Sequence, residues 1–103
     1  MAIVFLQEFK IDGDDRSTTN YDSIMSQLDM EANPPDGLVV HTAGWDEDAG
    51  VFRILDVWES QEHGETYLRE TLQPFLDQGP ANPENAGPPD RIGMYELHDI
   101  VTS

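Results

Sequence analysis

Three side chains near the middle of the chain combine groups that could take a proton from an aromatic substrate and hold its ring. His41 stands in the run GLVVHTAGW, and Asp56 and Trp58 stand two residues apart in RILDVWES. A neutral imidazole can accept a phenolic proton near neutral pH, because histidine titrates in that range. We therefore treat His41 and Asp56 as candidate catalytic residues, and Trp58 as a candidate substrate-binding residue that would pack on the ring.

Asp56 is unusual because it lies in a run that reads as a core strand, on the same face as Phe52, Ile54 and Trp58. A buried ionised carboxylate costs several kcal/mol unless it is paired or hydrogen-bonded. The donors that the pattern offers are the Trp58 indole, the hydroxyls of Tyr67 and Tyr95, and the imidazoles of His41 and His98. The structural alternative is that Asp56 anchors a loop or a helix end at the sheet edge.

His41 meets Asp56 only in one register of the hairpin that should join their strands. In one register His41 is opposite Asp56; after a slip of one residue it is opposite Leu55, on the other face. The five-residue turn DEDAG between the strands does not decide between the two. The alternative role for His41 is that of a core or interface histidine whose hydrogen bonds are satisfied.

Tyr67 and His98 are further candidates for substrate binding. Tyr67 belongs to an apolar helical stripe, as does Tyr21; such residues are usually core, but they would also line a cavity between helix and sheet. His98 alternates with Met94 and Glu96 on the last strand, and it could reach the pocket, a dimer interface or a backbone partner. His63, among acidic residues at a helix start, should be solvated.

No motif indicates a metal or a cofactor. The run Asp12-Gly-Asp-Asp15 has the wrong order for an EF-hand loop, and Ser23 stands where that loop needs glutamate. The sequence has no GxSxG elbow, glycine-rich phosphate loop or dinucleotide fingerprint, which argues against the common hydrolase, kinase and Rossmann functions. We expect neither a metal nor a cofactor.

The elements that must position these residues alternate strands with helices. Strands are expected at residues 2–9, 37–45, 51–59 and 91–101. One helix should start at a capping box formed by Thr19 and Asp22 and end before Asn33-Pro-Pro35; a second should follow Ser60 as N-cap and bend or break near Pro74. The proline-rich segment 79–90 should be a surface loop.

This order predicts a single α+β domain over residues 1–103, with the ferredoxin-like β-α-β-β-α-β arrangement and a four-stranded antiparallel sheet. The first and last strands carry apolar residues on both faces, so both faces should be covered. Two helices can cover only one face. We therefore predict a homodimer in which two sheets pack against each other.

Composition restricts the partners. The chain has 21 acidic and 5 basic residues, a net charge of −16, and no cysteine. Without clustered lysine or arginine, it should bind neither nucleic acid nor an anionic membrane surface. The acidity is compatible with adaptation to high salt or with an acidic proteome. No signal peptide or membrane span is recognisable, so we expect a cytoplasmic protein.

The element order, the hairpin and the motif VWESQE, in which Trp58 leads through Ser60 to Glu62, resemble the dimeric α/β-barrel superfamily, and most closely its small antibiotic-biosynthesis-monooxygenase-type proteins. The resemblance covers the whole chain as architecture but only residues 58–62 as a motif. It implies a pocket between sheet and helices for a phenolic or polyketide-like substrate, which itself supplies the electrons that activate dioxygen, without a cofactor.

Trp58 matches the tryptophan of that family's pocket, but the family's pocket asparagine has no counterpart here in a strand or on an apolar helix face. Two functions therefore stay open. The first is cofactor-independent oxidation of a small aromatic ligand. The second is a non-catalytic dimeric module that binds a ligand or only assembles, in which His41, Asp56 and Trp58 stabilise the core and the interface.

Overall fold

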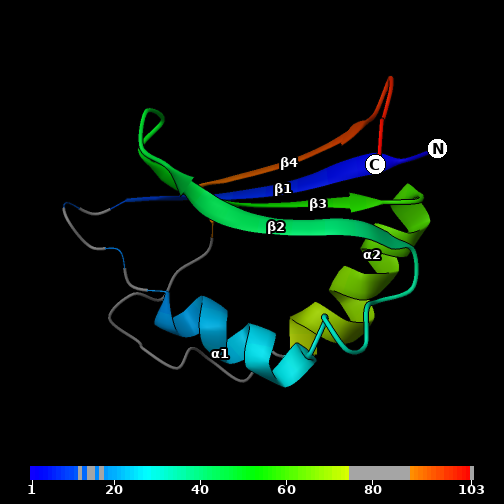
Figure 1. Cartoon of the computed structure of the whole chain (residues 1–103), viewed down its shortest axis with the longest axis horizontal. Helices are drawn as coiled ribbons and strands as arrows, with labels where there is room; N and C mark the ends of the chain where they lie inside the picture. The colour runs from blue at the N-terminus through cyan, green and yellow to red at the C-terminus, as the bar shows by residue number, and fades with distance from the viewer. Residues whose placement is uncertain (12, 14–15, 17, 75–88, 103) are drawn as a thin grey trace.

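The four predicted strands form one antiparallel sheet. The computed structural model describes residues 1–11, 13, 16, 18–74 and 89–102 of the chain. The strands are β1 (Ile3–Lys10), β2 (Leu38–Asp46), β3 (Val51–Trp58) and β4 (Arg91–Glu96), and their order in the sheet is β2-β3-β1-β4. This is the predicted ferredoxin-like α+β arrangement, with β1 and β3 at the centre (Figure 1).

The first helix, α1 (Thr19–Leu28), begins one residue earlier than its predicted cap implies. Thr18, not Thr19, is the N-cap, and its hydroxyl donates to the Asp22 carboxylate at 2.7 Å. The helix ends where Asp29 adopts a left-handed conformation with φ of 51°. It therefore stops before the two prolines, as predicted.

The second helical segment starts at Ser60, as the sequence predicts. Ser60 Oγ accepts the backbone N–H of His63 at 3.2 Å, which caps α2 (Gln61–Tyr67). The helix then widens into the π-helical turn η1 (Leu68–Leu72). Pro74 lies two residues further on; it has no N–H to donate, and its ring conflicts with the carbonyl four residues earlier, which favours such an irregularity. The rest of the predicted stripe, Phe75 and Leu76, and most of the predicted loop lie outside the described residues.

The last strand is shorter than predicted. β4 ends at Glu96 rather than at residue 101. The backbone N–H of Leu97 still donates to the Ala2 carbonyl at 2.9 Å, but the chain then leaves the sheet. The last pair of the ladder is Ile3 of β1 with Glu96.

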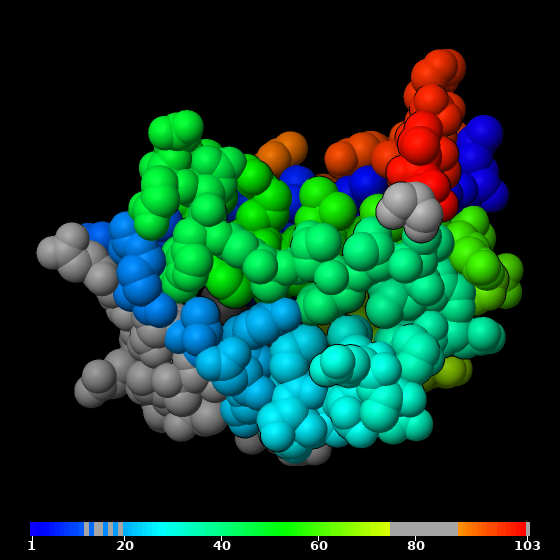
Figure 2. Space-filling view, in the orientation of Figure 1, coloured from blue at the N-terminus to red at the C-terminus, as the bar shows by residue number. Residues whose placement is uncertain are grey.

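Both helices lie on one side of the sheet, and Figure 1 shows no helix on the other side among the described residues. On the helix side, Trp58 packs with Ile3 and Tyr67. On the opposite side, Val4, Leu6 and Val57 form a second buried cluster. In Figure 2 the helix α1 lies directly against the green strands, whereas C-terminal residues, in red, project beyond the sheet on its other side. The predicted apolar character of both faces is confirmed.

Half of the helix-free face is charged, and its charges are paired with one another. Arg53 donates to Glu8 at 2.7 Å and to Asp46 at 2.7 Å, and Arg91 donates to the second Glu8 oxygen at 3.1 Å. The hydrogen bonds from the two guanidinium groups lower the pKa of Glu8. This network pairs two guanidinium groups with two carboxylates, and the buried apolar cluster lies beside it on the same face.

Among the helices that the structure describes, none is both long and apolar enough to cross a membrane.

Candidate functional site

His41 and Asp56 lie opposite each other on β2 and β3, on the helix side of the sheet. This pairing continues the register that starts at the turn with Asp46 opposite Val51, and a register shift follows only beyond it, between Leu38 and Val40. His41 Nδ1 is 2.5 Å from Asp56 Oδ1. Of the donors that the sequence offered to Asp56, His41 is the one that the structure places in hydrogen-bond contact with it.

Tyr21 extends this pair into a chain of three groups. Its hydroxyl oxygen is 2.7 Å from His41 Nε2, and the two rings are nearly parallel, with an angle of 7° between their planes. Because an ionised carboxylate only accepts hydrogen bonds, Nδ1 carries a proton, and in the neutral ring Nε2 accepts the tyrosine O–H. Tyr21 therefore donates its hydrogen bond to His41, and His41 donates its own to Asp56. We call this array the relay.

The relay is largely shielded from solvent, but it is not sealed. The side chains of Asp56 and His41 are 7% and 18% exposed. Burial, together with the negative charges of Asp56 and Asp22, raises the pKa of Tyr21 above its ordinary value. Tyr21 therefore stays protonated at neutral pH and can donate to His41, while His41 remains within reach of a small molecule.

An aromatic row leads from the relay towards the surface. The Tyr21 ring meets Phe52 edge-on at 5.6 Å, and Phe52 packs against Trp45 at 4.7 Å between ring centroids. The Arg16 guanidinium lies 5.4 Å from the Trp45 ring centroid. These contacts fix the Tyr21 ring, and with it the direction in which its hydroxyl points.

Trp58 belongs to the core rather than to an open surface. It is 1% exposed, and its ring centroid lies 4.9 Å from that of Tyr67. Gly64 of α2 leaves room for the indole: a Cβ at residue 64 would be only 3.2 Å from Trp58 Cδ1. Trp58 shares the helix-facing side of β3 with Asp56, yet neither the cleft beside Tyr67 nor the shallow one beside Trp45 is lined by His41, Asp56 or Trp58.

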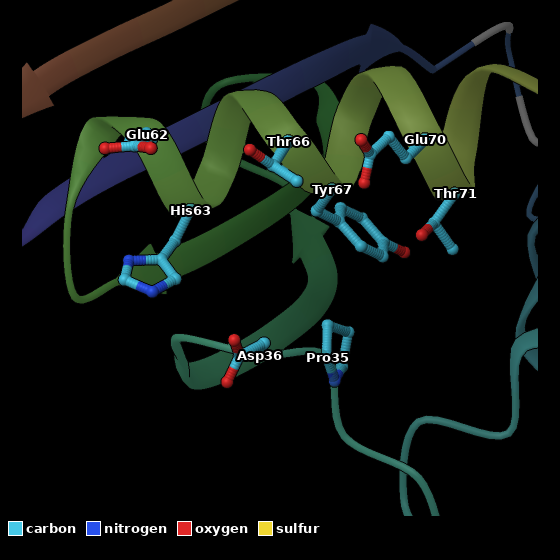
Figure 3. A pocket seen from close by; sticks show the side chains of 8 residues that line it. All are labelled: Pro35, Asp36, Glu62, His63, Thr66, Tyr67, Glu70 and Thr71. Atoms are coloured by element: carbon cyan, nitrogen blue, oxygen red, sulfur yellow. The ribbon is translucent and has the colours of Figure 1, made fainter.

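Tyr67 separates Trp58 from a cleft on the other side of its ring. The cleft, of about 430 Å³, lies between the second helical segment and the connection that precedes β2. Figure 3 shows that His63, Tyr67 and Thr71 point from the helix towards Pro35 and Asp36. Burial, with smaller contributions from the charges of Asp56 and Tyr21, raises the pKa of Tyr67, so its hydroxyl remains protonated at neutral pH.

The expectation that His63 is solvated is wrong. His63 is partly buried, its Nδ1 lies 2.7 Å from Ser60 Oγ, and its ring fills the space beside Gly37. Gly37 has φ of 83°, and a Cβ there would overlap the imidazole. The helix cap and this glycine together hold the histidine at the rim of the cleft, an arrangement that needs two segments far apart in the sequence.

His98 lies apart from the relay. It follows β4, is exposed, and sits at the opposite edge of the sheet from His41 on β2. Tyr95 is on the helix-free face, opposite Val4, and is 51% exposed. Within the part of the chain that the structure describes, no three His, Asp or Glu side chains are placed to hold a metal ion.

Tyr21 is the member of the relay that the sequence analysis left in the core. Its position on the apolar stripe of α1 is explained by packing on Phe52 alone. The tyrosine hydroxyl could have indicated a further contact from the sequence, because a buried tyrosine hydroxyl generally needs a hydrogen-bond partner. Naming His41 as that partner required the position of α1 over β2.

The sequence matches no protein-family model and no curated protein sequence. Solved structures do match. Rv0793 from Mycobacterium tuberculosis is similar with a TM-score of 0.69 and 13% identity, over 99% of this chain and 100% of that one. SnoaB, a cofactor-independent oxygenase from Streptomyces nogalater, is similar with a TM-score of 0.62 and 13% identity, over 99% and 98% of the two chains.

A third similar structure is a monooxygenase from the gene ActVA-Orf6 of Streptomyces coelicolor in complex with nanaomycin D. It has a TM-score of 0.56 and 14% identity, over 99% of this chain and 92% of that one. At such identities the likeness concerns the fold. The chain thus has the ferredoxin-like α+β fold of the antibiotic biosynthesis monooxygenase-type proteins, and the resemblance drawn from its sequence is confirmed at that level.

Proposed function

We propose that this chain is a cofactor-independent oxygenase that acts on a small phenolic or polyketide-like aromatic substrate at the relay. The observation that carries the proposal is the continuous hydrogen-bonded array from Tyr21 through His41 to Asp56. A base oriented by a carboxylate, with a hydroxyl on its other nitrogen, is suited to general base catalysis near neutral pH.

In this proposal the relay generates a phenolate. A substrate hydroxyl donates to Tyr21 Oη, and as Tyr21 passes its own proton to His41 Nε2, it takes up the substrate proton. Asp56 stabilises the imidazolium that results, because the carboxylate already accepts the Nδ1 proton. The phenolate is more readily oxidised by dioxygen than the phenol. One oxygen atom then enters the ring to give a quinone, and the other leaves as water, with all four electrons supplied by the substrate.

The structural neighbours support the substrate class and the lack of a cofactor. SnoaB is described as a cofactor-independent oxygenase, and the ActVA-Orf6 monooxygenase holds nanaomycin D as ligand. We extend both features to this chain as part of the proposal. Trp58 and Tyr67 would form the aromatic wall behind the substrate, whereas His98, at the far sheet edge, would contribute to contacts between chains.

Tyr21→Phe is expected to lower the rate of oxygen consumption by about 100-fold or more, since general acid–base steps contribute roughly 10²–10⁴. The substitution keeps the ring on Phe52 and removes only the hydroxyl. The measurement uses an oxygen electrode with a panel of hydroxynaphthalenes and hydroxyanthracenes. Tyr95→Phe, which removes an exposed hydroxyl on the other face, is the matched control. Equal rates in both variants, or no oxygen consumption by the unmodified protein with any compound, would refute the oxygenase function.

One observation favours the second function, a non-catalytic module. Trp58 is 1% exposed, and the cleft beside Tyr67 is lined by neither His41 nor Asp56. A buried hydrogen-bonded array can serve as a structural element that holds α1 on β2 and β3. In that case His41 and Tyr21 variants would lose stability, and no compound of the panel would be oxidised.

We further propose that the chain forms a homodimer through the helix-free face. Val40, Val57, Val4 and Tyr95 are paired across all four strands as a single row on that face. Val40 and Tyr95, at its two ends, are 43% and 51% exposed. An apolar row of this kind, beside a charged half whose partners are already satisfied, fits a second copy of the same sheet.

Val40→Glu is expected to convert the dimer into a monomer, because it places a carboxylate in the apolar row. Sedimentation equilibrium should give twice the 11.6 kDa chain mass for the unmodified protein and the single chain mass for the variant. Association should strengthen with added NaCl, since each chain carries a charge of −16. Gln27→Glu, on exposed α1 surface, adds the same charge and should stay dimeric. A monomeric unmodified protein would contradict the proposal.

A further inference from the structure

The cleft beside Tyr67 has a chemical character that the relay does not use. Eight residues line it: Pro35, Asp36, Glu62, His63, Thr66, Tyr67, Glu70 and Thr71. Three of them are carboxylates, and no lysine or arginine is among them. Its floor is an aromatic ring, and its volume of about 430 Å³ is within the range of small-molecule sites.

Two rows of side chains from the second helical segment build the cleft. His63, Tyr67 and Thr71, spaced by four residues, face Pro35 and Asp36 across the opening (Figure 3). Glu62, Thr66 and Glu70 follow the same spacing one position earlier and form its rim. Asp36 therefore approaches from one wall, and Glu62 and Glu70 from the other.

Tyr67 supplies an observation independent of the charge. The residue is only 8% exposed, yet its hydroxyl makes no hydrogen bond to any residue that the structure describes. Figure 3 shows the Tyr67 ring above Pro35, with its oxygen directed into the space below Thr71. The oxygen is not sealed in the core, because the described residues include no fully buried side-chain nitrogen or oxygen that lacks a hydrogen-bond partner. It therefore opens onto the cleft, where a ligand or solvent can complete its hydrogen bonds.

We propose that this cleft binds a small organic ammonium ion. The ammonium group has three donors and a positive charge, which match the Tyr67 oxygen as acceptor and the carboxylates of Asp36 and Glu62 as counter-charges. The Tyr67 face and Pro35 accommodate the apolar part of the ligand. Glu70 contributes less, because the Arg69 guanidinium already lies 3.9 Å from its carboxylate. The site goes beyond the proposed oxygenase function and does not depend on it.

Benzylammonium is a suitable probe, and benzyl alcohol is its neutral isostere. In an NMR titration of the full chain at low salt, benzylammonium should shift the amides of α2, Asp36 and Gly37, and bind at least about tenfold more tightly than benzyl alcohol. The affinity should fall at about 0.5 M NaCl, where charges are strongly screened. Equal affinities for the two compounds, or shifts spread over the whole surface, would overturn the proposal.

Variants distinguish the cleft from the general acidity of the chain. Asp36→Asn and Glu62→Gln should each weaken binding by about threefold, and the double variant by about tenfold, as for partly exposed ion pairs. Glu65→Gln removes the same charge from the same helix, but Glu65 does not line the cleft, so its affinity should be unchanged. Tyr67→Phe should weaken binding by about fivefold, the value of one hydrogen bond.

If Tyr67→Phe reduces folding, the test uses the Asp36→Asn and Glu62→Gln variants instead. Both of these carboxylates are exposed at the surface, so their substitution should not affect folding. An equal loss in Glu65→Gln and Glu62→Gln would mean that benzylammonium senses only the net charge, and the proposed site would be wrong. The comparison of the Asp36, Glu62 and Glu65 variants is independent of oxygen consumption, because none of these three residues belongs to the relay or to the proposed substrate wall.

Discussion

His41→Ala is expected to lower the free energy of unfolding by about 3 kcal/mol, the cost typical of a buried ion pair that loses one partner. The substitution leaves the Asp56 carboxylate, which is 7% exposed, without its hydrogen-bond donor, and it also deprives the Tyr21 hydroxyl of its acceptor. Urea denaturation followed by circular dichroism at neutral pH measures the change.

A double-mutant cycle separates the energy of the His41–Asp56 interaction from the energy of removing the imidazole itself. Asp56→Asn in the His41→Ala background should recover part of the lost stability, because the neutral amide costs less to bury than an unpaired charge. His98→Ala is the matched control: the residue is exposed, and the change should stay within about 0.5 kcal/mol. A His41→Ala variant as stable as His98→Ala would show that the relay is not formed in solution.

Trp58→Ala is expected to be the most destabilising single substitution considered, at about 3–5 kcal/mol. The indole is 1% exposed and packs against Tyr67 and Ile3, so its loss opens a cavity in the helix-side core. Circular dichroism is the suitable readout, since the variant loses one of the two tryptophans. Trp45→Ala provides the comparison: Trp45 is 36% exposed and should cost less than half as much.

The loss of stability expected for Trp58→Ala would also lower its measured activity. Small domains are stable by only about 5–15 kcal/mol, so Trp58→Ala would leave part of the population unfolded. Loss of turnover in that variant would not identify Trp58 as a substrate contact. Trp58→Phe, which keeps most of the packing, and Tyr21→Phe, which keeps the ring, separate the chemistry from the fold. A Trp58→Ala variant with nearly unchanged stability would instead indicate that the indole lines an open pocket in solution.

The sequence by itself determined the elements and their order. Alternation of apolar residues marked the four strands, the helical stripes marked both helices, and Ser60 marked the start of α2. It also determined that both sheet faces are apolar, because the side-chain period of a strand is fixed. These features depend on local backbone chemistry and spacing, which a single sequence contains.

Only the tertiary structure decided which side chains meet. The hairpin register, with Asp46 opposite Val51 at the turn, placed His41 opposite Asp56, and a slip of one residue would have turned His41 to the other face. The packing of α1 brought Tyr21 to His41, and the approach of Gly37 to α2 positioned His63. The last strand ended at Glu96, opposite Ile3 of β1. Each outcome depends on the relative placement of segments distant in the chain, and that placement follows from packing of the whole domain rather than from the composition of any one segment.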